Sequence, residues 1–133
     1  MRRKSTLTLI AAVCACLIVL SACSSVRPRD VVQEVYEALQ KNDYKAAYDL
    51  TSSFFQQNTN YEAFEEAVKK LFEEKGELKQ VEIGKTEMIG SQTALVNVTL
   101  TWSKDGSDTQ EEKRITLPNE KGKWKVDGSI IIK

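Results

Sequence analysis

The residue types that could carry out chemistry are few in this chain of 133 residues. It contains no His, which removes the commonest general base, the commonest metal ligand and the Ser-His and Cys-His nucleophile pairs. No Gly-rich phosphate loop occurs, and the acidic residues do not follow the spacing of a calcium-binding loop. We therefore predict no metal site and no cofactor. The residue that stands out is Cys23, because of what precedes it.

Cys23 follows a stretch that has the order of an export signal. A basic start formed by Arg2, Arg3 and Lys4 is followed by an apolar run and by small residues just before the Cys. The apolar run, Leu7 to Leu20, is 14 residues long. A helix that crosses a bilayer needs roughly 18 to 20 apolar residues. The sequence therefore predicts a cleaved signal peptide in preference to a permanent membrane span.

The four residues Leu20-Ser21-Ala22-Cys23 resemble the lipobox of bacterial lipoproteins. The resemblance implies that the Cys23 sulfur receives a diacylglyceryl group, that the chain is cleaved just before Cys23, and that the new N-terminus is acylated, for example with palmitate. Residues 1–22 would be the removed signal peptide and residues 23–29 a lipidated tether. The protein would be anchored to the cell membrane on its extracytoplasmic side. A plain secreted protein and an uncleaved anchor are the alternatives.

Cleavage would change both the cysteine content and the charge. Cys14 and Cys16 would leave with the signal peptide, so the mature chain could form no internal disulfide. The whole chain carries 19 basic and 19 acidic residues, and loss of the three basic residues at its start leaves a net charge of −3. This mildly acidic surface does not favour nucleic acid as a partner. The tether, extended, would reach at most about 20 Å from the membrane.

Hydrophobic periodicity predicts three helices after the tether. Pro28 suits the first position of a helix whose apolar residues recur at helical spacing. Asp43 can cap a second helix, which carries aromatic residues as far as Phe55. The segment Thr59-Asn60-Tyr61-Glu62 fits a capping box that opens a third helix with Thr59 as its cap, and Gly76 would end that helix.

Beyond Gly76 the hydrophobic period changes from helical to alternating, which is typical of strands. We predict strands over residues 78–88, 94–102 and 110–117, and a fourth strand that carries Trp124 and Val126. In the second of these, Ala94 and every second residue after it would face the core. Leu95, Thr99 and Thr101 would then form an outer patch through which two copies could pair.

Three helices followed by four antiparallel strands predict an α+β domain with helices packed on one face of a curved sheet. The Pro-initiated helix, the segment Asp43–Leu50 and the closing segment Gly122–Asp127 together resemble bacterial lipoproteins with an NTF2-like, DUF4878-type domain. The resemblance implies an NTF2-like domain over residues 30–133, in which the helices and a bent sheet enclose a conical pocket. In that superfamily the pocket binds small ligands, supports proton transfer or holds partners.

One catalytic arrangement known from ketosteroid-isomerase-like members stays open, in which a buried carboxylate acts as a base beside a Tyr donor. Asp49 lies near Tyr36, Tyr44 and Tyr48 in the sequence and supplies the residue types. Adjacent residues on a helix point in different directions, however, so Asp49 points away from Tyr48. The simpler interpretation leaves Asp49 exposed and packs the Tyr rings with their hydroxyls at the rim. We predict no catalytic residue.

Five aromatic residues could line the mouth of the pocket: Tyr36, Tyr48, Phe64, Trp102 and Trp124. They could equally be core residues, because a cone-shaped core and a pocket differ only in whether side chains fill it. We predict a non-catalytic binding or envelope-interaction domain, attached to the membrane through Cys23, with a protein or a small apolar ligand as partner. A small-molecule-binding or weakly catalytic pocket protein is the alternative. A purely structural envelope component is a third class.

Overall fold

The computed structural model describes residues 25–133, and its first element is helix α1, Pro28–Gln40. Pro28 occupies the first helical position, as predicted, because its missing N–H would have no partner there. The Asp30 carboxylate accepts a hydrogen bond from the Arg27 N–H at 3.2 Å and so satisfies a free donor at the helix start. One face of α1 is buried, and it consists of Pro28, Val31, Val32, Val35, Tyr36, Ala38 and Leu39.

The predicted second helix is two short helices, α2 (Tyr44–Asp49) and α3 (Ser53–Asn58). Asp43 caps α2 as expected, through a hydrogen bond from the Ala46 N–H. The prediction of a single helix was wrong because the backbone between α2 and α3 forms hydrogen bonds with a segment that is distant in sequence. The Ser52 N–H donates to the Val126 carbonyl at 2.8 Å, and the Val126 N–H donates to the Leu50 carbonyl at 2.9 Å. Four helices therefore precede the sheet, where the sequence predicted three.

Helix α4 (Tyr61–Lys75) begins one residue later than the capping box predicted. Its cap is Asn60, whose side-chain oxygen accepts the Ala63 N–H at 2.9 Å. Thr59 instead ends α3 in an extended conformation. The C-terminal prediction is confirmed, since Gly76 follows the last helical residue with φ of 91°. Glycine adopts this left-handed conformation at little steric cost.

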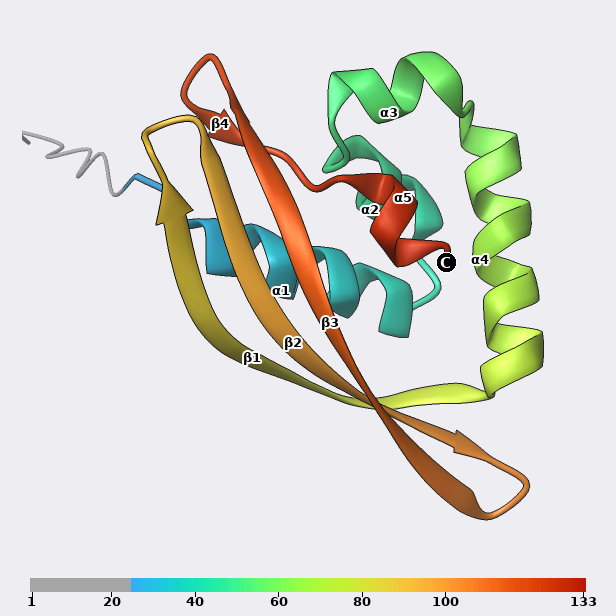
Figure 1. The fold of residues 1–133 in the computed structure, drawn as a ribbon. Helices are drawn as coiled ribbons and strands as arrows, with labels where there is room; N and C mark the ends of the chain where they lie inside the picture. The colour runs from blue at the N-terminus through green and yellow to red at the C-terminus, as the bar shows by residue number, and fades with distance from the viewer. Residues whose placement is uncertain (1–24) are drawn as a thin grey trace, which may run out of the picture.

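Four antiparallel strands follow in the order β1-β2-β3-β4 (Figure 1). They are β1 (Glu77–Ile89), β2 (Thr93–Lys104), β3 (Ser107–Glu120) and β4 (Lys123–Trp124). The register of β1 against β2 shifts twice, between Leu78 and Gln80 and between Ile83 and Thr86, and such irregularities bend a sheet. The fourth strand is shorter than predicted. Val126 lies outside it and forms an isolated parallel bridge with Thr51.

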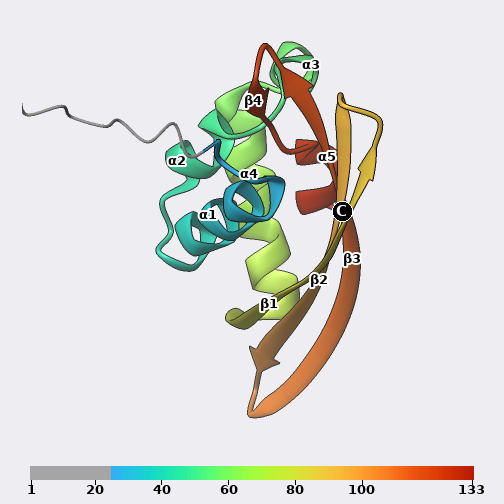
Figure 2. The ribbon, with the colours of Figure 1, turned by 90° about the vertical axis from the view of Figure 1, so that its left-hand side faces the viewer.

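The described chain closes with a short helix, α5 (Gly128–Ile131), where we predicted no helix. Asp127 caps it by accepting a hydrogen bond from the Ser129 N–H at 3.0 Å. In Figure 2 the curved sheet forms one layer, the longer helices lie on one side of it, and α5 lies between the two. The C-terminal segment therefore occupies the interior of the curve that the sheet makes.

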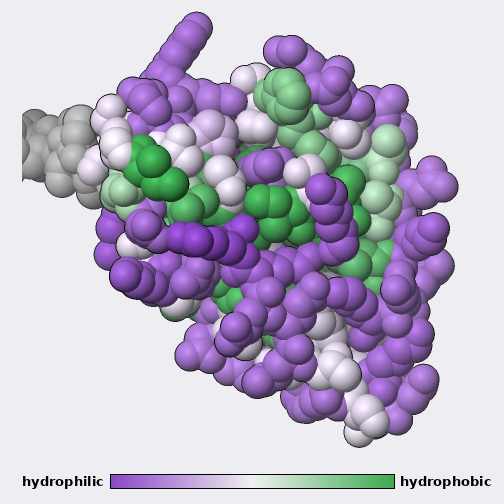
Figure 3. Space-filling view, in the orientation of Figure 1, coloured by the Kyte–Doolittle hydropathy of each residue, from purple (hydrophilic) through white to green (hydrophobic). Residues whose placement is uncertain are grey.

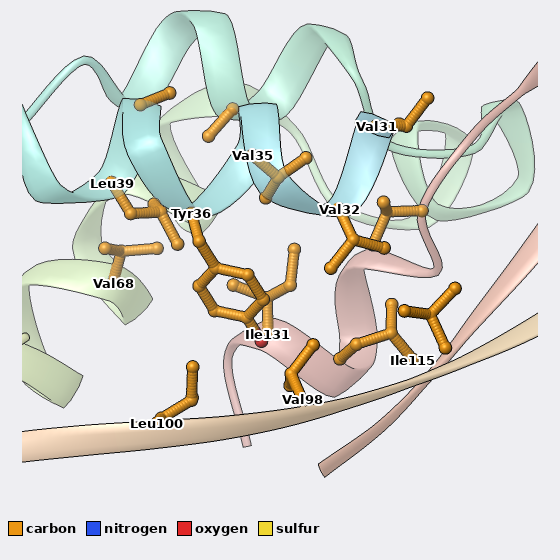
Figure 4. Packing of buried hydrophobic residues seen from close by; sticks show 14 of the residues in the cluster. Val31, Val32, Val35, Tyr36, Leu39, Val68, Val98, Leu100, Ile115 and Ile131 are labelled. Carbon is orange, nitrogen blue, oxygen red and sulfur yellow. The ribbon is translucent and has the colours of Figure 1, made fainter. Parts of the chain in front are cut away.

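Apolar side chains from all the layers meet in one core (Figure 4). The inward residues of β2 are the predicted alternating set, Ala94, Val96, Val98, Leu100 and Trp102, and each is at most 2% exposed. Ile131 of α5 is buried among residues of α1, β2 and β3. The predicted α+β class, with helices on one face of a curved four-stranded sheet, is confirmed.

Candidate functional site

The five aromatic residues expected at a pocket mouth lie in four different places. Tyr48 and Phe64 belong to an aromatic group with Phe55 and Tyr61, in which the Tyr48 and Phe64 ring centroids are 5.5 Å apart. Trp102 packs edge-on against Phe72, with centroids 5.4 Å apart. These side chains fill the space between the helices and the sheet.

Tyr36 and Trp124 are separate from that aromatic group. Trp124 is half-buried on β4, where it pairs with Asn119 of β3. Tyr36 is only 3% exposed and reaches from α1 toward the sheet, beside Ile131 and Val98 (Figure 4). Its hydroxyl oxygen is buried and has no hydrogen-bond partner among the described residues. Burial, together with the negative charge of Glu111, raises the pKa of this hydroxyl well above its ordinary value, so the group stays neutral.

A charged cluster lies where the core opens to solvent, between the end of α4 and strands β2 and β3. Its centre is Glu111 of β3, whose Oε2 accepts hydrogen bonds from the Lys75 Nζ at 2.5 Å and from the Trp102 Nε1 at 3.2 Å. The Lys113 Nζ lies 3.7 Å from the other carboxylate oxygen. The Lys75 Nζ also lies over the Trp102 ring, 5.7 Å from its centroid. We call Lys75, Trp102, Glu111 and Lys113 the Glu111 cluster.

The Glu111 cluster keeps its carboxylate ionised. Partial burial alone would raise the pKa of Glu111, but the hydrogen bonds and positive charges of Lys75 and Lys113 and the Trp102 N–H outweigh it and hold the pKa below its ordinary value. A general base that works near neutral pH needs a pKa close to that pH. The arrangement therefore suits an ion pair that orients side chains better than it suits proton abstraction.

Lys113 is the most buried cation of this cluster, with a side chain 9% exposed. Burial lowers the pKa of its ammonium group, and the neighbouring Glu111 charge offsets this in part. The Lys113 Nζ donates to the carbonyl oxygens of Ile130 at 3.1 Å and Lys133 at 2.8 Å. Lys113 thus fastens the α5 segment to β3, which keeps Ile131 in the core.

A groove with a volume of about 490 Å³ runs past the Glu111 cluster at the surface. Lys104 lies along it and donates to the carbonyl oxygens of Glu73 and Glu74 at 2.8 and 2.9 Å, close to the end of α4. Most side chains that line the groove are polar or charged, and Trp102 is the large apolar residue among the lining residues. The groove residues are Glu74, Lys75, Trp102, Lys104, Ser107, Thr109, Gln110 and Glu111.

Sequence reasoning missed Glu111, Lys113 and Lys75. A signal for the first two was present, because residues at every second position of a strand share a face. Ile115 and Leu117 are the large apolar residues of this strand and mark its inward face, so the same parity places Lys113 and Glu111 on that face. Lys75 carried no such signal, since its contact with Glu111 depends on how α4 lies against the sheet.

The structure does not bring Asp49 together with a tyrosine hydroxyl. The Asp49 carboxylate is exposed and pairs with the Lys45 Nζ at 2.6 Å. The Tyr48 hydroxyl donates to the Thr59 carbonyl at 2.7 Å, and the Tyr44 hydroxyl donates to Asn42 at 3.2 Å. Asp49 is thus exposed, as the simpler interpretation predicted, but that interpretation was wrong for Tyr36, whose hydroxyl is buried and does not lie at the rim.

Two further observations concern metals and membranes. Within residues 25–133, no group of three or more His, Cys, Asp or Glu side chains is placed to hold a metal ion. None of the helices in that range combines the length and the apolar character that crossing a bilayer requires. Cys23 and the predicted signal peptide lie outside the described residues.

Comparison with protein families gives one match, to the family described as "Domain of unknown function (DUF4864)", over residues 24–133. The chain belongs to the DUF4864 family. The match spans nearly the whole predicted mature chain, and it replaces the DUF4878 label that the sequence resemblance suggested, which nothing here confirms. No curated protein matches the chain closely enough to count as a relative.

Solved structures place this DUF4864 domain among NTF2-like folds. It is similar to a "Putative NTF2-like transpeptidase" from Campylobacter jejuni, with 16% identity, a TM-score of 0.54, and coverage of 76% of this chain and 97% of that chain. It is also similar to the helical cell shape determining protein Pgp2 from Campylobacter jejuni, with 10% identity and a TM-score of 0.50. That second match covers 73% of this chain and 37% of that chain. At these identities the likeness shows the fold alone, and the predicted NTF2-like fold is confirmed.

Proposed function

We propose that this DUF4864 protein is a lipid-anchored domain on the extracytoplasmic side of the cell membrane, where it binds a protein partner without catalysing a reaction. The observation that carries the proposal is the filled interior of the fold. The space between helices and sheet holds the aromatic group around Phe64, the Tyr36 ring and Ile131 of α5. A filled interior leaves the surface as the place for recognition.

Glu111, a half-buried carboxylate beside that interior, is poorly suited to acid or base chemistry. Glu111 is held ionised by Lys75, Lys113 and the Trp102 N–H, and Lys113 is itself engaged with backbone carbonyls. The groove beside the Glu111 cluster offers ammonium, carboxylate, hydroxyl and amide groups next to the edge of Trp102. Trp102 is only 2% exposed, so a partner would contact these polar groups, which are typical of the rim of protein–protein contacts and are less suited to a small apolar ligand.

A place in the cell envelope is supported from two independent sides. The lipobox resemblance at Cys23 implies an anchor, and two acyl chains or more hold a protein stably at a membrane. The two structural neighbours carry names that refer to a transpeptidase and to cell shape. We infer for this chain a partner in the envelope.

Crosslinking in living cells tests the binding role. A photoreactive amino acid at Lys104, in the groove, should give a discrete adduct with another protein in the full-length chain. The same amino acid at Lys85, an exposed residue of β1 outside the groove, is the control. Identical adducts from both positions, or none from Lys104, would contradict the groove as the binding surface.

Fatty-acid labelling tests the anchor separately. The wild-type chain should incorporate labelled palmitate and fractionate with membranes, whereas Cys23→Ser should lose the label and keep its precursor length. The reason is that lipid attachment to the sulfur precedes cleavage in the lipoproteins that this segment resembles. Equal labelling of the two chains would remove the anchor from the proposal and leave the groove experiment unaffected.

A second function, a small-ligand pocket in the core, is favoured by the Tyr36 hydroxyl. A buried polar group without a partner is costly by about 1 to 3 kcal/mol, and a ligand that bonded to it would recover that cost. Ligand entry would require α5 to move away from Tyr36. A screen of small polar molecules by thermal unfolding tests this function, and a hit that raises the Tm of wild type but not of Tyr36→Phe would support it.

A further inference from the structure

The large apolar side chains that the described residues expose gather at one end of the domain. They are Val26, Phe54, Met88 and Ile89, with exposures from 50% to 77%. Both ribbon views place the start of α1, helix α3 and the β1–β2 turn in the upper half of the molecule (Figures 1 and 2). The space-filling view shows hydrophobic surface in the upper left part of this face, more of it across the middle, and a mainly hydrophilic lower part (Figure 3).

Hydrogen bonds between distant segments explain why these residues share an end. The Gln40 side chain at the end of α1 donates to the Leu78 carbonyl at the start of β1, at 3.2 Å. Helix and strand therefore run in opposite directions, and the start of α1 faces the end of β1. The Asn119 N–H donates to the Gln92 carbonyl at 2.8 Å, which joins the tips of the two upper hairpins.

Helix α3 is held against the same hairpin tips. The Glu120 carboxylate accepts hydrogen bonds from the Ser53 N–H at 3.0 Å and from the Ser53 hydroxyl at 2.8 Å. Phe54, the next residue, is the most exposed of the large apolar side chains in the described part of the chain. These hydrogen bonds thus join the segments that carry Phe54, Met88 and Ile89, and the opposite directions of α1 and β1 bring Val26 to the same half of the molecule.

Basic residues without ion-pair partners accompany this apolar end. Arg29 precedes Asp30 on α1, and Lys121 and Lys123 lie at the β3–β4 turn; within residues 25–133 these three cations form no ion pair. The acidic residues close by are engaged, since Asp30 pairs with Arg27 and Glu87 pairs with Arg114. Exposed apolar side chains with free cations beside them match the chemistry of an anionic bilayer surface.

We propose that this end of the domain, formed by Val26, Phe54, Met88 and Ile89 with Arg29, Lys121 and Lys123, lies against an anionic lipid bilayer. We call it the membrane-facing end. The inference rests on the proposed anchor at Cys23, because only Ser24 and Ser25 lie between Cys23 and Val26, and the three Cα–Cα steps span at most about 11 Å when extended. That short link directs this end toward the bilayer. A second copy of the chain is a weaker occupant, because its cations would face those of the first.

The experiment uses the full chain, isolated from membranes and reconstituted into vesicles of phosphatidylcholine and phosphatidylglycerol in equal parts. An environment-sensitive fluorophore is attached at Ile89→Cys, and at Ser107→Cys as the control, an exposed residue of the β2–β3 hairpin at the opposite end. A quencher attached to lipid should reduce the fluorescence emission at position 89 several-fold more than at position 107. Iodide dissolved in the water should quench the fluorophore at position 107 more than the one at position 89. Lys121→Glu with Lys123→Glu should weaken the protection at position 89.

Equal quenching at the two positions would overturn the proposal. Protection at position 89 that appears without vesicles and increases with protein concentration would also overturn it, since it would assign the end to contact between copies. Mass spectrometry of the N-terminal peptide reports the anchor independently. If Cys23 carries no lipid, the proposed anchor is wrong. The labelled chain is then mixed with added vesicles: binding that protects position 89 would support contact between this end and lipid, and a lack of binding would contradict it.

Discussion

At the scale of single residues, the two buried tyrosines differ in what their hydroxyls contact. The Tyr48 hydroxyl donates to the Thr59 carbonyl, whereas the Tyr36 hydroxyl has no partner among the described residues. Removing a buried hydroxyl that bonds to nothing removes a desolvation cost, and removing one that bonds to a carbonyl leaves that carbonyl unsatisfied. These two residues therefore form a matched pair for mutation.

We expect Tyr36→Phe to raise the free energy of unfolding by about 1 kcal/mol and Tyr48→Phe to lower it by about 1 kcal/mol. Urea unfolding of the two variants beside wild type measures both changes. A loss of stability in Tyr36→Phe would mean that water or a ligand occupies the hydroxyl in solution. That result would favour the small-ligand pocket over the filled core.

Glu111 predicts how stability depends on pH. Its pKa in the folded protein lies below the ordinary value of 4.5, so the folded state binds the proton more weakly than the unfolded state. The stabilisation is fully present above the ordinary pKa and is lost as the pH falls through the lowered pKa. Between neutral pH and acid, wild type should therefore lose more stability than Glu111→Gln.

The measurement is urea unfolding of wild type and Glu111→Gln from pH 7 down to pH 3. The free energies of unfolding of the two proteins are subtracted at each pH, so that the contributions of the other carboxylates cancel. At pH 7 we expect Glu111→Gln to cost about 2 kcal/mol, because charged hydrogen bonds from Lys75 and Trp102 are weakened. The exposed pair Lys45–Asp49 provides a control, and Asp49→Asn should cost much less. If the free energies of unfolding of wild type and Glu111→Gln change with pH in parallel, the ion pair between Glu111 and its lysines is contradicted.

At the scale of elements, the junction between α4 and β1 depends on Gly76. Its φ is 91°, and a Cβ there would overlap the Ser103 carbonyl of the neighbouring strand. Gly90 also has a positive φ, 62°, but a Cβ there would meet nothing within 4 Å. The two glycines therefore differ in this overlap, and Gly76, with a ψ of −149°, also lies in a backbone region that is open almost only to glycine.

We expect Gly90→Ala to cost about 1 kcal/mol, from the left-handed conformation alone. Gly76→Ala should cost about 3 kcal/mol, because the overlap adds a packing cost of roughly 1 to 3 kcal/mol. Chemical unfolding of the two variants measures the difference. Equal costs would show that the end of α4 moves away from β2 easily. The shape of the groove beside Lys104 would then be less well fixed, and the case for it as a binding surface would be weaker.

At the scale of the whole molecule, pairing of two copies through the outer sheet face stays a prediction. Leu95, Thr99 and Thr101 lie half-buried on the outward side of β2, between the outward residues of β1 and β3. If this face forms a homodimer, Thr99→Arg should shift the protein from dimer to monomer without changing its fold. Sedimentation of the detergent-solubilised chain checks this, with Thr109→Arg on the inward side of β3 as the control.

Much of this protein follows from local sequence. Pro28, Asp43 and Gly76 act through their own backbone preferences and short-range hydrogen bonds, so the helix boundaries that depend on them could be predicted. The alternation from Ala94 to Trp102 reflects a period of two, which a strand with one buried face requires. The NTF2-like α+β fold could be recognised from these patterns and from the closing Gly122–Asp127 segment.

Other features were decided by tertiary structure alone. The break between α2 and α3 exists because Leu50 and Ser52 bond to Val126, and α5 forms where Ile131 enters a space that the sheet and α1 leave. Lys75 meets Glu111 across 36 positions of sequence. The residues themselves predict an export signal, which stays a prediction, and they predict the fold, because both depend on short-range pattern. Whether the interior is filled, and which apolar residues share one exposed end, depends on contacts between distant segments that no local pattern records.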